Sequence, residues 1–344
     1  MNTLSKRLHE VLEYPALSTS ARNTSFYPSS VSVETTDALG KKIIGSCLRQ
    51  QYYSFTQETE SNRGEVDYSF SAMMGDKVSE LLVQLIDQHG FKMGLQRLAV
   101  EHRLFDPRIN LSGRCDIIAW DYKNNEPVGI EVKSVGEYKA SKTMEMPAME
   151  HLMQAVLYLD YYRTYLPQEQ VVPKKWYIWY CSRTENYSIK AKKHGSPLTM
   201  LWDFYITLDD EGVPTVHTDK ISKTLPEFSV PKLHARYIKL AEYINNKILP
   251  DRDYELEYSP EKITSMYKLD MLTRKADKEA VEKWLKKGAP EGKLKLELGD
   301  FECKLCAYRS KCWGLDFKVT GKKLANLPLK GEALPKTDAN KNMW

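Results

Sequence analysis

Two carboxylates and a lysine interrupt an otherwise apolar stretch of the sequence, "RCDIIAWDYKNNEPVGIEVKS", at residues 114–134. Asp116 stands before Ile-Ile-Ala, and Glu131, Val132 and Lys133 lie near the end of the second apolar run. This pattern is typical of two short strands joined by a turn, so we expect Asp116 and Glu131 side by side on a sheet. Two converging carboxylates with water form a hard-oxygen site that suits Mg²⁺ or Mn²⁺.

The alternation of side chains along a strand assigns a role to each residue of Glu-Val-Lys. Glu131 and Lys133 are predicted on one face, and Val132 on the other, in the core. The carbonyl of Val132 could add a ligand to the cation. The lysine beside it could orient or help deprotonate a water, or hold a phosphate, as phosphodiester hydrolysis requires. A surface hairpin with a solvated Glu and Lys would have the same pattern, so the three residues alone leave both interpretations open.

A long helix is predicted next, in "EMPAMEHLMQAVLYLDYYRTYL". Gln154 and Tyr158 are one turn apart and share a face of this helix, with His151 one turn earlier. The other side is apolar enough to pack on the sheet. An ordinary half-buried polar face would also explain this pair.

Together, "GRCDIIAW", "GIEVKS" and "QAVLY" resemble, in order and spacing, the Asp, ExK and Q-x-x-x-Y motifs of the PD-(D/E)XK nuclease superfamily in its RecB-like branch. The resemblance implies that Asp116 and Glu131 bind the metal and that Lys133 is catalytic. It implies that Gln154 and Tyr158 contact DNA or support the site.

The sequence departs from this branch at one position. The branch usually carries G-x-x-x-H on a preceding helix, with the histidine as a metal ligand, and the matching segment here is Gly75-Asp76-Lys77-Val78-Ser79. Serine is a poor ligand, so we expect Glu80, the next residue, to replace the histidine. His89 and His102 do not stand at the family position and are expected to be surface or structural residues.

Three cysteines form a C-x2-C-x5-C cluster in "FECKLCAYRSKC": Cys303, Cys306 and Cys312. Three thiolates this close can surround one metal centre, with a fourth ligand from elsewhere in the chain. Tetrahedral zinc and a [4Fe–4S] cluster both take four thiolates, so the number of ligands does not separate them.

The family resemblance suggests both the fourth ligand and the cofactor. RecB-like nucleases with an iron–sulfur cluster carry one early cysteine and three late ones with this spacing, and Cys47 in "GSCLRQQYY" fits the early position. The resemblance, which extends to CRISPR-associated adaptation exonucleases and AddB-type nuclease domains, implies a structural [4Fe–4S] cluster, with zinc as the alternative. The cluster would join the two ends of the domain. Cys115 and Cys181 are then expected to be free.

Helices, strands, a helix and further strands follow one another along the chain, which predicts an α/β fold. The resemblance specifies a restriction-endonuclease-like mixed sheet flanked by helices. We expect an N-terminal extension at 1–26, a nuclease domain at 27–315 that includes the cysteines and a candidate helical insertion at about 230–295, and a basic, loosely ordered tail at 316–344. A helix in "YSFSAMMGDKVSELLVQLIDQHGF", residues 68–91, is predicted to stop at His89-Gly90.

The composition is that of an ordinary globular protein, with 42% hydrophobic and 28% charged residues and a net charge of +4. This charge permits a nucleic-acid partner without arguing for one. No apolar run reaches the ~18 residues of a membrane span, and the N-terminus lacks the apolar core of a signal peptide. We therefore expect a cytoplasmic protein that does not enter membranes.

The expected function is a metal-dependent deoxyribonuclease, an exonuclease acting on single-stranded DNA or DNA ends in recombination, DNA processing or the metabolism of a phage or mobile element. No G-x-x-x-x-G-K-[ST] loop is present, so unwinding would require a helicase or recombination partner. Two alternatives remain open. One is a catalytically impaired DNA-binding or scaffolding relative. The other is an endonuclease whose cysteines bind zinc instead of an iron–sulfur cluster.

Overall fold

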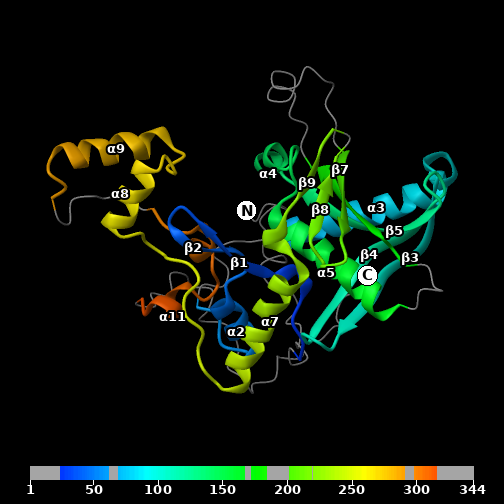
Figure 1. Cartoon of the computed structure of the whole chain (residues 1–344), viewed down its shortest axis with the longest axis horizontal. Helices are drawn as coiled ribbons and strands as arrows, with labels where there is room; N and C mark the ends of the chain where they lie inside the picture. The colour runs from blue at the N-terminus through cyan, green and yellow to red at the C-terminus, as the bar shows by residue number, and fades with distance from the viewer. Residues whose placement is uncertain are drawn as a thin grey trace, which may run out of the picture.

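The structure is a computed structural model that describes residues 24–61, 69–166, 172–183, 201–218, 220–290 and 298–315. It has the α/β architecture that the sequence predicts, with a large mixed sheet flanked by helices (Figure 1). The tail expected at 316–344 and most of the N-terminal extension lie outside the described residues. None of the helices among the described residues is long and apolar enough to cross a membrane.

The large sheet has seven strands in sequential order. They are β3 (Leu95–Asp106), β4 (Leu111–Asp121), β5 (Glu126–Val135), β6 (Lys175–Ser182), β7 (Leu201–Leu208), β8 (Pro214–His217) and β9 (Ser222–Thr224). All neighbours are antiparallel except β5 and β6, which are parallel. A parallel pair requires a crossover, and α4 (Glu137–Lys142) and α5 (Met149–Tyr165) provide it.

Helices α3 (Ser69–Met93) and α5 cover opposite faces of this sheet. Consecutive side chains of β4 point to opposite faces of the sheet, because side chains alternate along a strand. Ile117 and Ala119 pack in a cluster with Leu82 of α3, whereas Ile118 packs in the cluster that contains most of α5. The sheet thus has a buried layer on each side.

Helix α3 continues beyond the predicted stop at Gly90 and ends at Met93. The true end is marked by Gly94, which has φ +77°, the left-handed conformation that glycine adopts after a helix. Gly90 is needed for a different reason: a Cβ there would lie 2.3 Å from the carbonyl oxygen of Leu95. The predicted stop was wrong because this glycine allows the helix to pack closely against the following strand.

Helix α5 is buried on almost every side, because further elements pack on its surface away from the sheet. These are β1 (Ser32–Asp37), β2 (Gly40–Gly45), the short helix η1 (Pro28–Ser30) and α7 (Val230–Asn245). The β1–β2 hairpin was not predicted. After the hairpin comes helix α2 (Leu48–Phe55), and Cys47 is its N-cap residue.

The region expected to form a helical insertion divides into two parts. Helix α7, which follows η2 (Pro226–Phe228), contributes Leu233 and Leu240 to the main core. Helices α8 (Pro260–Lys268) and α9 (Lys275–Lys286) instead share a small apolar cluster of their own and project from the side of the molecule (Figure 1). The late cysteines lie at α10 (Phe301–Lys304) and α11 (Arg309–Trp313).

Candidate active site

The site begins where two strands of the large sheet separate. Pairing of β4 with β5 runs only as far as Ile117 and Ile130, after which β4 stays with β3 and β5 stays with β6. Asp116 and Glu131 are the first residues beyond this point, which we call the fork. The backbone N–H of Val132 donates to Oδ2 of Asp116 at 2.7 Å and so bridges the fork.

Lys133 reaches the same place from β5. Its ammonium group donates to Oε1 of Glu131 at 2.6 Å and to Oε1 of Gln154 at 2.9 Å. Glu131 and Lys133 therefore share the face of β5 that α5 covers, as the alternation predicts. Val132 points to the opposite face and packs in the apolar cluster with α3.

The hydrogen bonds of Gln154 and Tyr158 continue from Lys133 into the core. Nε2 of Gln154 donates to the hydroxyl of Tyr158 at 2.8 Å, and that hydroxyl donates to the carbonyl of Arg114 at 3.0 Å. Gln154 is 7% exposed and Tyr158 only 1%. Of the two roles that the resemblance left open, their burial and their hydrogen bonds favour support of the site.

The electrostatics of the fork are dominated by buried negative charge. Burial raises the pKa of Asp116 to about 8, with a further contribution from the charge of Glu131. Burial also raises the pKa of Glu131, although Lys133 opposes this effect. Oε2 of Glu131 is buried and has no hydrogen-bond partner in the structure. An unpaired buried carboxylate oxygen is costly, and this one is available to a cation.

The carbonyl of Val132 is directed toward this site as well. In an extended strand the N–H and C=O of one residue point to the same side. Because the N–H of Val132 donates to Asp116, its carbonyl faces the fork rather than β6. The donor set of Asp116, Glu131 and this carbonyl consists of oxygen atoms only, and it fits Mg²⁺ or Mn²⁺.

His151 lies one turn before Gln154 and is neutral. The hydroxyl of Tyr180 accepts from the N–H of Ala148 at 3.0 Å and is 2.7 Å from Nδ1 of His151. Burial holds the pKa of His151 well below its usual range, and the nearby charge of Lys133 adds to the effect.

The residues expected to replace the family histidine do not join the site through any contact that the structure describes. Glu80 is 56% exposed and pairs with Lys77 on its own helix. His89 is exposed, and Nδ1 of His102 lies 2.5 Å from the hydroxyl of Tyr162. Both histidines thus have the surface or structural positions expected of them.

One charged residue near the fork was not predicted. The charge of Glu101, on β3, raises the pKa of both Asp116 and Glu131. Its carboxylate pairs with Arg114 on β4. No local sequence signal marks Glu101, because its position depends on the register of β3 against β4.

The four cysteines assigned to the cluster line a single cavity. Cys47 is the N-cap residue of α2. Cys303 lies in α10, Cys312 lies in α11, and Cys306 lies in the turn between these two short helices. The cavity is also lined by Arg49, Tyr53, Arg252, Tyr254 and Trp313. Cys115 and Cys181 lie elsewhere, on β4 and β6.

The thiols have surroundings that could support bound metal. Burial raises the pKa of Cys303 to about 12 and raises those of Cys47 and Cys306, so these thiols retain their protons unless a metal displaces them. The N–H of Tyr308 donates to Sγ of Cys306 at 3.4 Å, and Arg49 approaches Sγ of Cys312 at 3.9 Å. Hydrogen bonds of this kind to cysteine sulfurs change the reduction potential of an iron–sulfur cluster.

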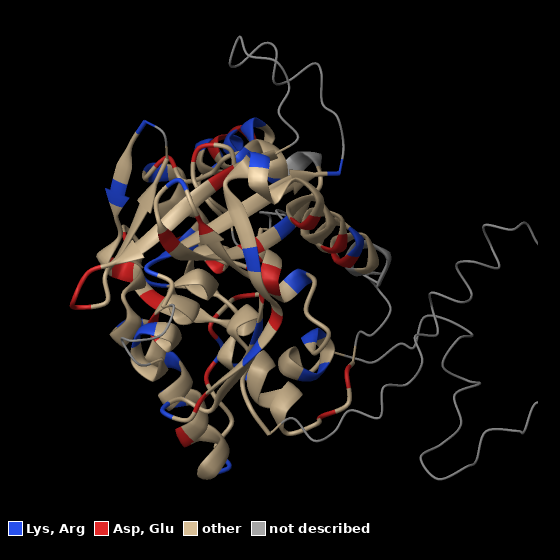
Figure 2. Cartoon of the chain, turned by 90° about the vertical axis from the view of Figure 1, so that its right-hand side faces the viewer, with Lys and Arg blue, Asp and Glu red and all other residues tan. Residues whose placement is uncertain are grey.

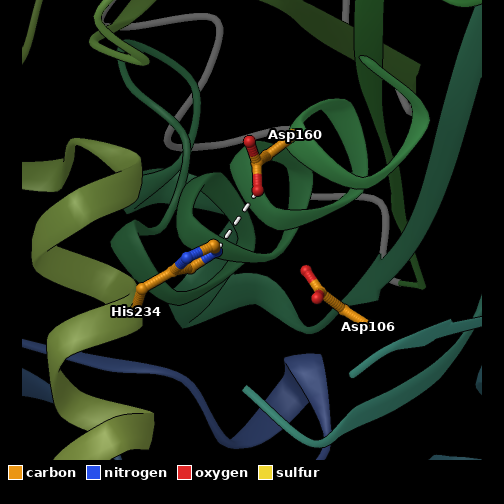
Figure 3. Close-up of side chains that lie close together, drawn as sticks. All are labelled: Asp106, Asp160 and His234. Atoms are coloured by element: carbon orange, nitrogen blue, oxygen red, sulfur yellow. Dashed lines mark ion pairs between the residues drawn. The ribbon is translucent and has the colours of Figure 1, made fainter. Parts of the chain in front are cut away.

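A second acidic group contains Asp106, Asp160 and His234, whose ligand atoms lie within 4.8 Å of one another (Figure 3). The guanidinium group of Arg108 already lies between the two carboxylates and donates to both at 2.6 Å. Nε2 of His234 is 3.2 Å from Asp160, and Tyr165 donates to Asp106. We therefore interpret this group as an ion-pair network that joins β3, α5 and α7.

Comparison with known proteins does not assign a function, so an assignment has to rest on the chain's own residues. No protein-family model and no curated protein matches the chain. Among solved structures it is similar to one described as the crystal structure of SSO0001, with 17% identity and a TM-score of 0.35 over 71% of this chain and 86% of that chain. A likeness of this degree carries no argument about fold or function.

Proposed function

We propose that this protein is a metal-dependent deoxyribonuclease of the PD-(D/E)XK superfamily, in its RecB-like branch. The observation that carries the proposal is the fork, where Asp116, Glu131 and Lys133 meet around a buried carboxylate oxygen that has no partner. The family motifs supply the reaction class, and the contacts supply the reason why these residues act together. From the resemblance, the substrate is single-stranded DNA or a DNA end, and the enzyme is an exonuclease.

Asp116, Glu131 and the carbonyl of Val132 would hold one Mg²⁺ or Mn²⁺ ion. When bound, such an ion supplies Lewis acidity toward a phosphate and lowers the pKa of water. Asp116 is suited to the task because the Val132 N–H fixes one of its oxygens. Glu131 is suited because Lys133 fixes one oxygen and leaves the other without a partner.

Lys133 stabilises the negative charge that develops on the phosphate in the transition state. An ammonium group has three N–H donors, and the bonds to Glu131 and Gln154 use two of them. The third is left for a phosphate oxygen. Because the bonded neighbours hold the ammonium group in position, little reorganisation is needed during the reaction.

The cysteines are proposed to hold a structural [4Fe–4S] cluster rather than zinc. The family resemblance supports this choice: one early cysteine and three late ones at C-x2-C-x5-C spacing match the iron–sulfur members of the branch. The four cysteines line a single cavity, where they could bind one cofactor together.

The DNA partner would be held near the fork, which carries Lys133. Figure 2 shows Lys and Arg interspersed with Asp and Glu on the side of the molecule that carries the large sheet. Recognition of phosphates then depends on a few local cations such as Lys133. A helicase or recombination protein remains the proposed partner for unwinding.

Cleavage of end-labelled single-stranded DNA tests this function. Protein purified without oxygen is incubated with Mn²⁺ beside Lys133→Ala and Lys139→Ala, a control on an exposed lysine of α4. We expect metal-dependent degradation by the wild type and by Lys139→Ala, and a loss of at least ~100-fold with Lys133→Ala. DNA binding without cleavage by the wild type would instead support the catalytically impaired alternative.

A further inference from the structure

Glu101 lies directly opposite Asp116 across the β3–β4 ladder. Val100 pairs with Ile117 and His102 pairs with Cys115, which leaves Glu101 facing Asp116. Glu101 has φ +53°, a strained conformation for a residue other than glycine. Backbone strain of this kind persists only where the surrounding structure imposes it.

The strand opposite Glu101 is irregular at the same place. Cys115 packs in the cluster that contains α5, but Ile117 packs in the cluster that contains α3. In a regular strand two residues separated by one other point to the same face, so β4 changes face at Asp116. The irregularities of β3 and β4 therefore coincide at the fork.

Asp116 lies between Glu101 of β3 and the proposed ligands on β5. Glu101 faces it across the β3–β4 ladder, and the N–H of Val132, next to Glu131, donates to it from the other side, so three acidic residues meet at the fork. A second cation at this place would offset the excess negative charge. The buried Oε2 of Glu131, which has no partner, is the independent sign that a ligand belongs here.

Glu101 can be redirected at low cost. Its side chain is 43% exposed, and that of its partner, Arg114, is 61% exposed. An ion pair with this much solvent around it contributes little to stability. Opposite residues on antiparallel strands have Cβ atoms about 4.5–5.5 Å apart, so the Glu101 side chain, once released from Arg114, is long enough to reach a cation bound at Asp116.

We propose that Glu101 is the third acidic ligand of the divalent cation held by Asp116 and Glu131. Arg114 competes with the cation for the same carboxylate. This inference rests on the proposed function, and it assigns to β3 the role that the sequence suggested for Glu80 of α3.

Titration of Mn²⁺ into metal-free protein by calorimetry tests the assignment. The variants are Glu101→Gln, Arg114→Ala, Glu131→Gln and Glu80→Gln, the last being a matched control on another exposed, ion-paired glutamate. We expect Glu101→Gln to weaken binding by ~10-fold or more and Glu80→Gln to bind as the wild type does. Arg114→Ala should bind at least as tightly as the wild type, because the competitor is removed.

The outcomes separate this inference from the proposed function. If Glu101→Gln and Arg114→Ala weaken binding equally, the pair is only structural and the inference is overturned. If Glu101→Gln binds Mn²⁺ normally while Glu131→Gln does not, the inference is also overturned, but the metal site remains. If Glu131→Gln also binds as the wild type does, the proposed function fails. Thermal unfolding of each variant shows that the fold is retained.

Discussion

At the scale of single residues, the site depends on a chain of hydrogen bonds that holds one lysine. Lys133 donates to Gln154, Gln154 donates to Tyr158, and Tyr158 donates to the carbonyl of Arg114. Burial raises the pKa of Tyr158 far above its usual value, so its hydroxyl remains a donor at any working pH. This series of hydrogen bonds holds the ammonium group in position on the side that faces α5.

Tyr158→Phe should therefore slow cleavage by ~10-fold while leaving Mn²⁺ affinity nearly unchanged. It removes the hydroxyl that orients Gln154 and leaves a buried carbonyl without a donor, which should cost about 1–3 kcal/mol of stability. The matched control is Tyr162→Phe, one turn later on α5, because the hydroxyl of Tyr162 contacts His102 and Cys115 instead. Cleavage rates and thermal unfolding measure both effects; equal slowing in the two variants would argue against a positioning role.

Asp116 gives the metal-free protein a characteristic dependence of stability on pH. Its pKa is about 8 in the folded protein against an ordinary value of 3.8. Between these values the native state holds more protons than the unfolded chain, so stability falls as the pH rises through this window. The contribution is present below pH 4 and lost above pH 8.

Asp116→Asn removes this titration and keeps an oxygen that can accept from Val132. Its advantage in stability over the wild type should grow from pH 5 to pH 8, to roughly a few kcal/mol, when unfolding by denaturant is followed in a chelator. Added Mn²⁺ should stabilise the wild type and leave the variant unchanged. A difference that is constant with pH would mean that Asp116 titrates normally.

Most of the residues at the fork could be predicted, because a local pattern identifies them. Asp116, Glu131 and Lys133 interrupt apolar strands, and Gln154 and Tyr158 share a helix face. The sequence did not decide between DNA contact and support for the last two, since that depends on their burial between α5 and the sheet. Glu101 was not predictable, because both the β3–β4 register and its positive φ arise from tertiary structure.

At the scale of elements, the fork exists because β5 leaves β4 while it remains paired with β6. The fit between β5 and β6 depends on Gly129, which pairs with Trp176. The ring of Trp176 crosses this glycine and packs 5.0 Å, between centroids, from the ring of Tyr158. Packing between the strands thus supports the residue that anchors the hydrogen-bond chain.

Gly129→Ala should lower the stability of the protein by about 1–3 kcal/mol. The added Cβ would lie 2.2 Å from a ring carbon of Trp176, and the ring has no room to move in the core. Gly75→Ala, on α3 with nothing within 4 Å, is the control and should be neutral or slightly stabilising. Denaturant midpoints compare them, and a Gly129→Ala variant as stable as the wild type would refute the packing argument.

The elements themselves were predicted unevenly. The strands around the fork and the long helix α5 were predicted because their apolar patterns are strong. The β1–β2 hairpin was not, because a two-stranded ribbon is stable only through its packing, here on α5 and α7. The end of α3 was misplaced for a similar reason: Gly90 and Gly94 look alike in sequence and differ only in their surroundings.

At the scale of the whole molecule, the cysteine cavity joins segments from opposite ends of the described chain. The segment before α8 reinforces this junction. Asp253 accepts from the N–H of Leu48 at 2.7 Å and from Arg236 at 2.6 Å, and Arg252 donates to the carbonyl of Cys312 at 2.6 Å. A metal cluster in the cavity would close a loop that contains the entire sheet, and closing a long loop restricts the unfolded chain strongly.

Cys47→Ser and Cys312→Ser should therefore lose iron and unfold at a lower temperature than the wild type, with each loss comparable to that of a long-loop cross-link, about 2–5 kcal/mol. Cys181→Ser, on β6 and away from the cavity, should retain both the iron and the stability. Metal analysis and calorimetry of protein purified without oxygen measure these effects. A wild-type protein that contains stoichiometric zinc and no iron would contradict the proposed cluster.

The claim on which the account rests is that Asp116 and Glu131 bind one divalent cation at the fork. Anomalous scattering from a crystal soaked in Mn²⁺ tests it most directly. We predict a strong peak within bonding distance of both carboxylates, and no peak at Asp106, Asp160 and His234, where Arg108 already supplies the positive charge. A peak at that second group, with none at the fork, would contradict the account.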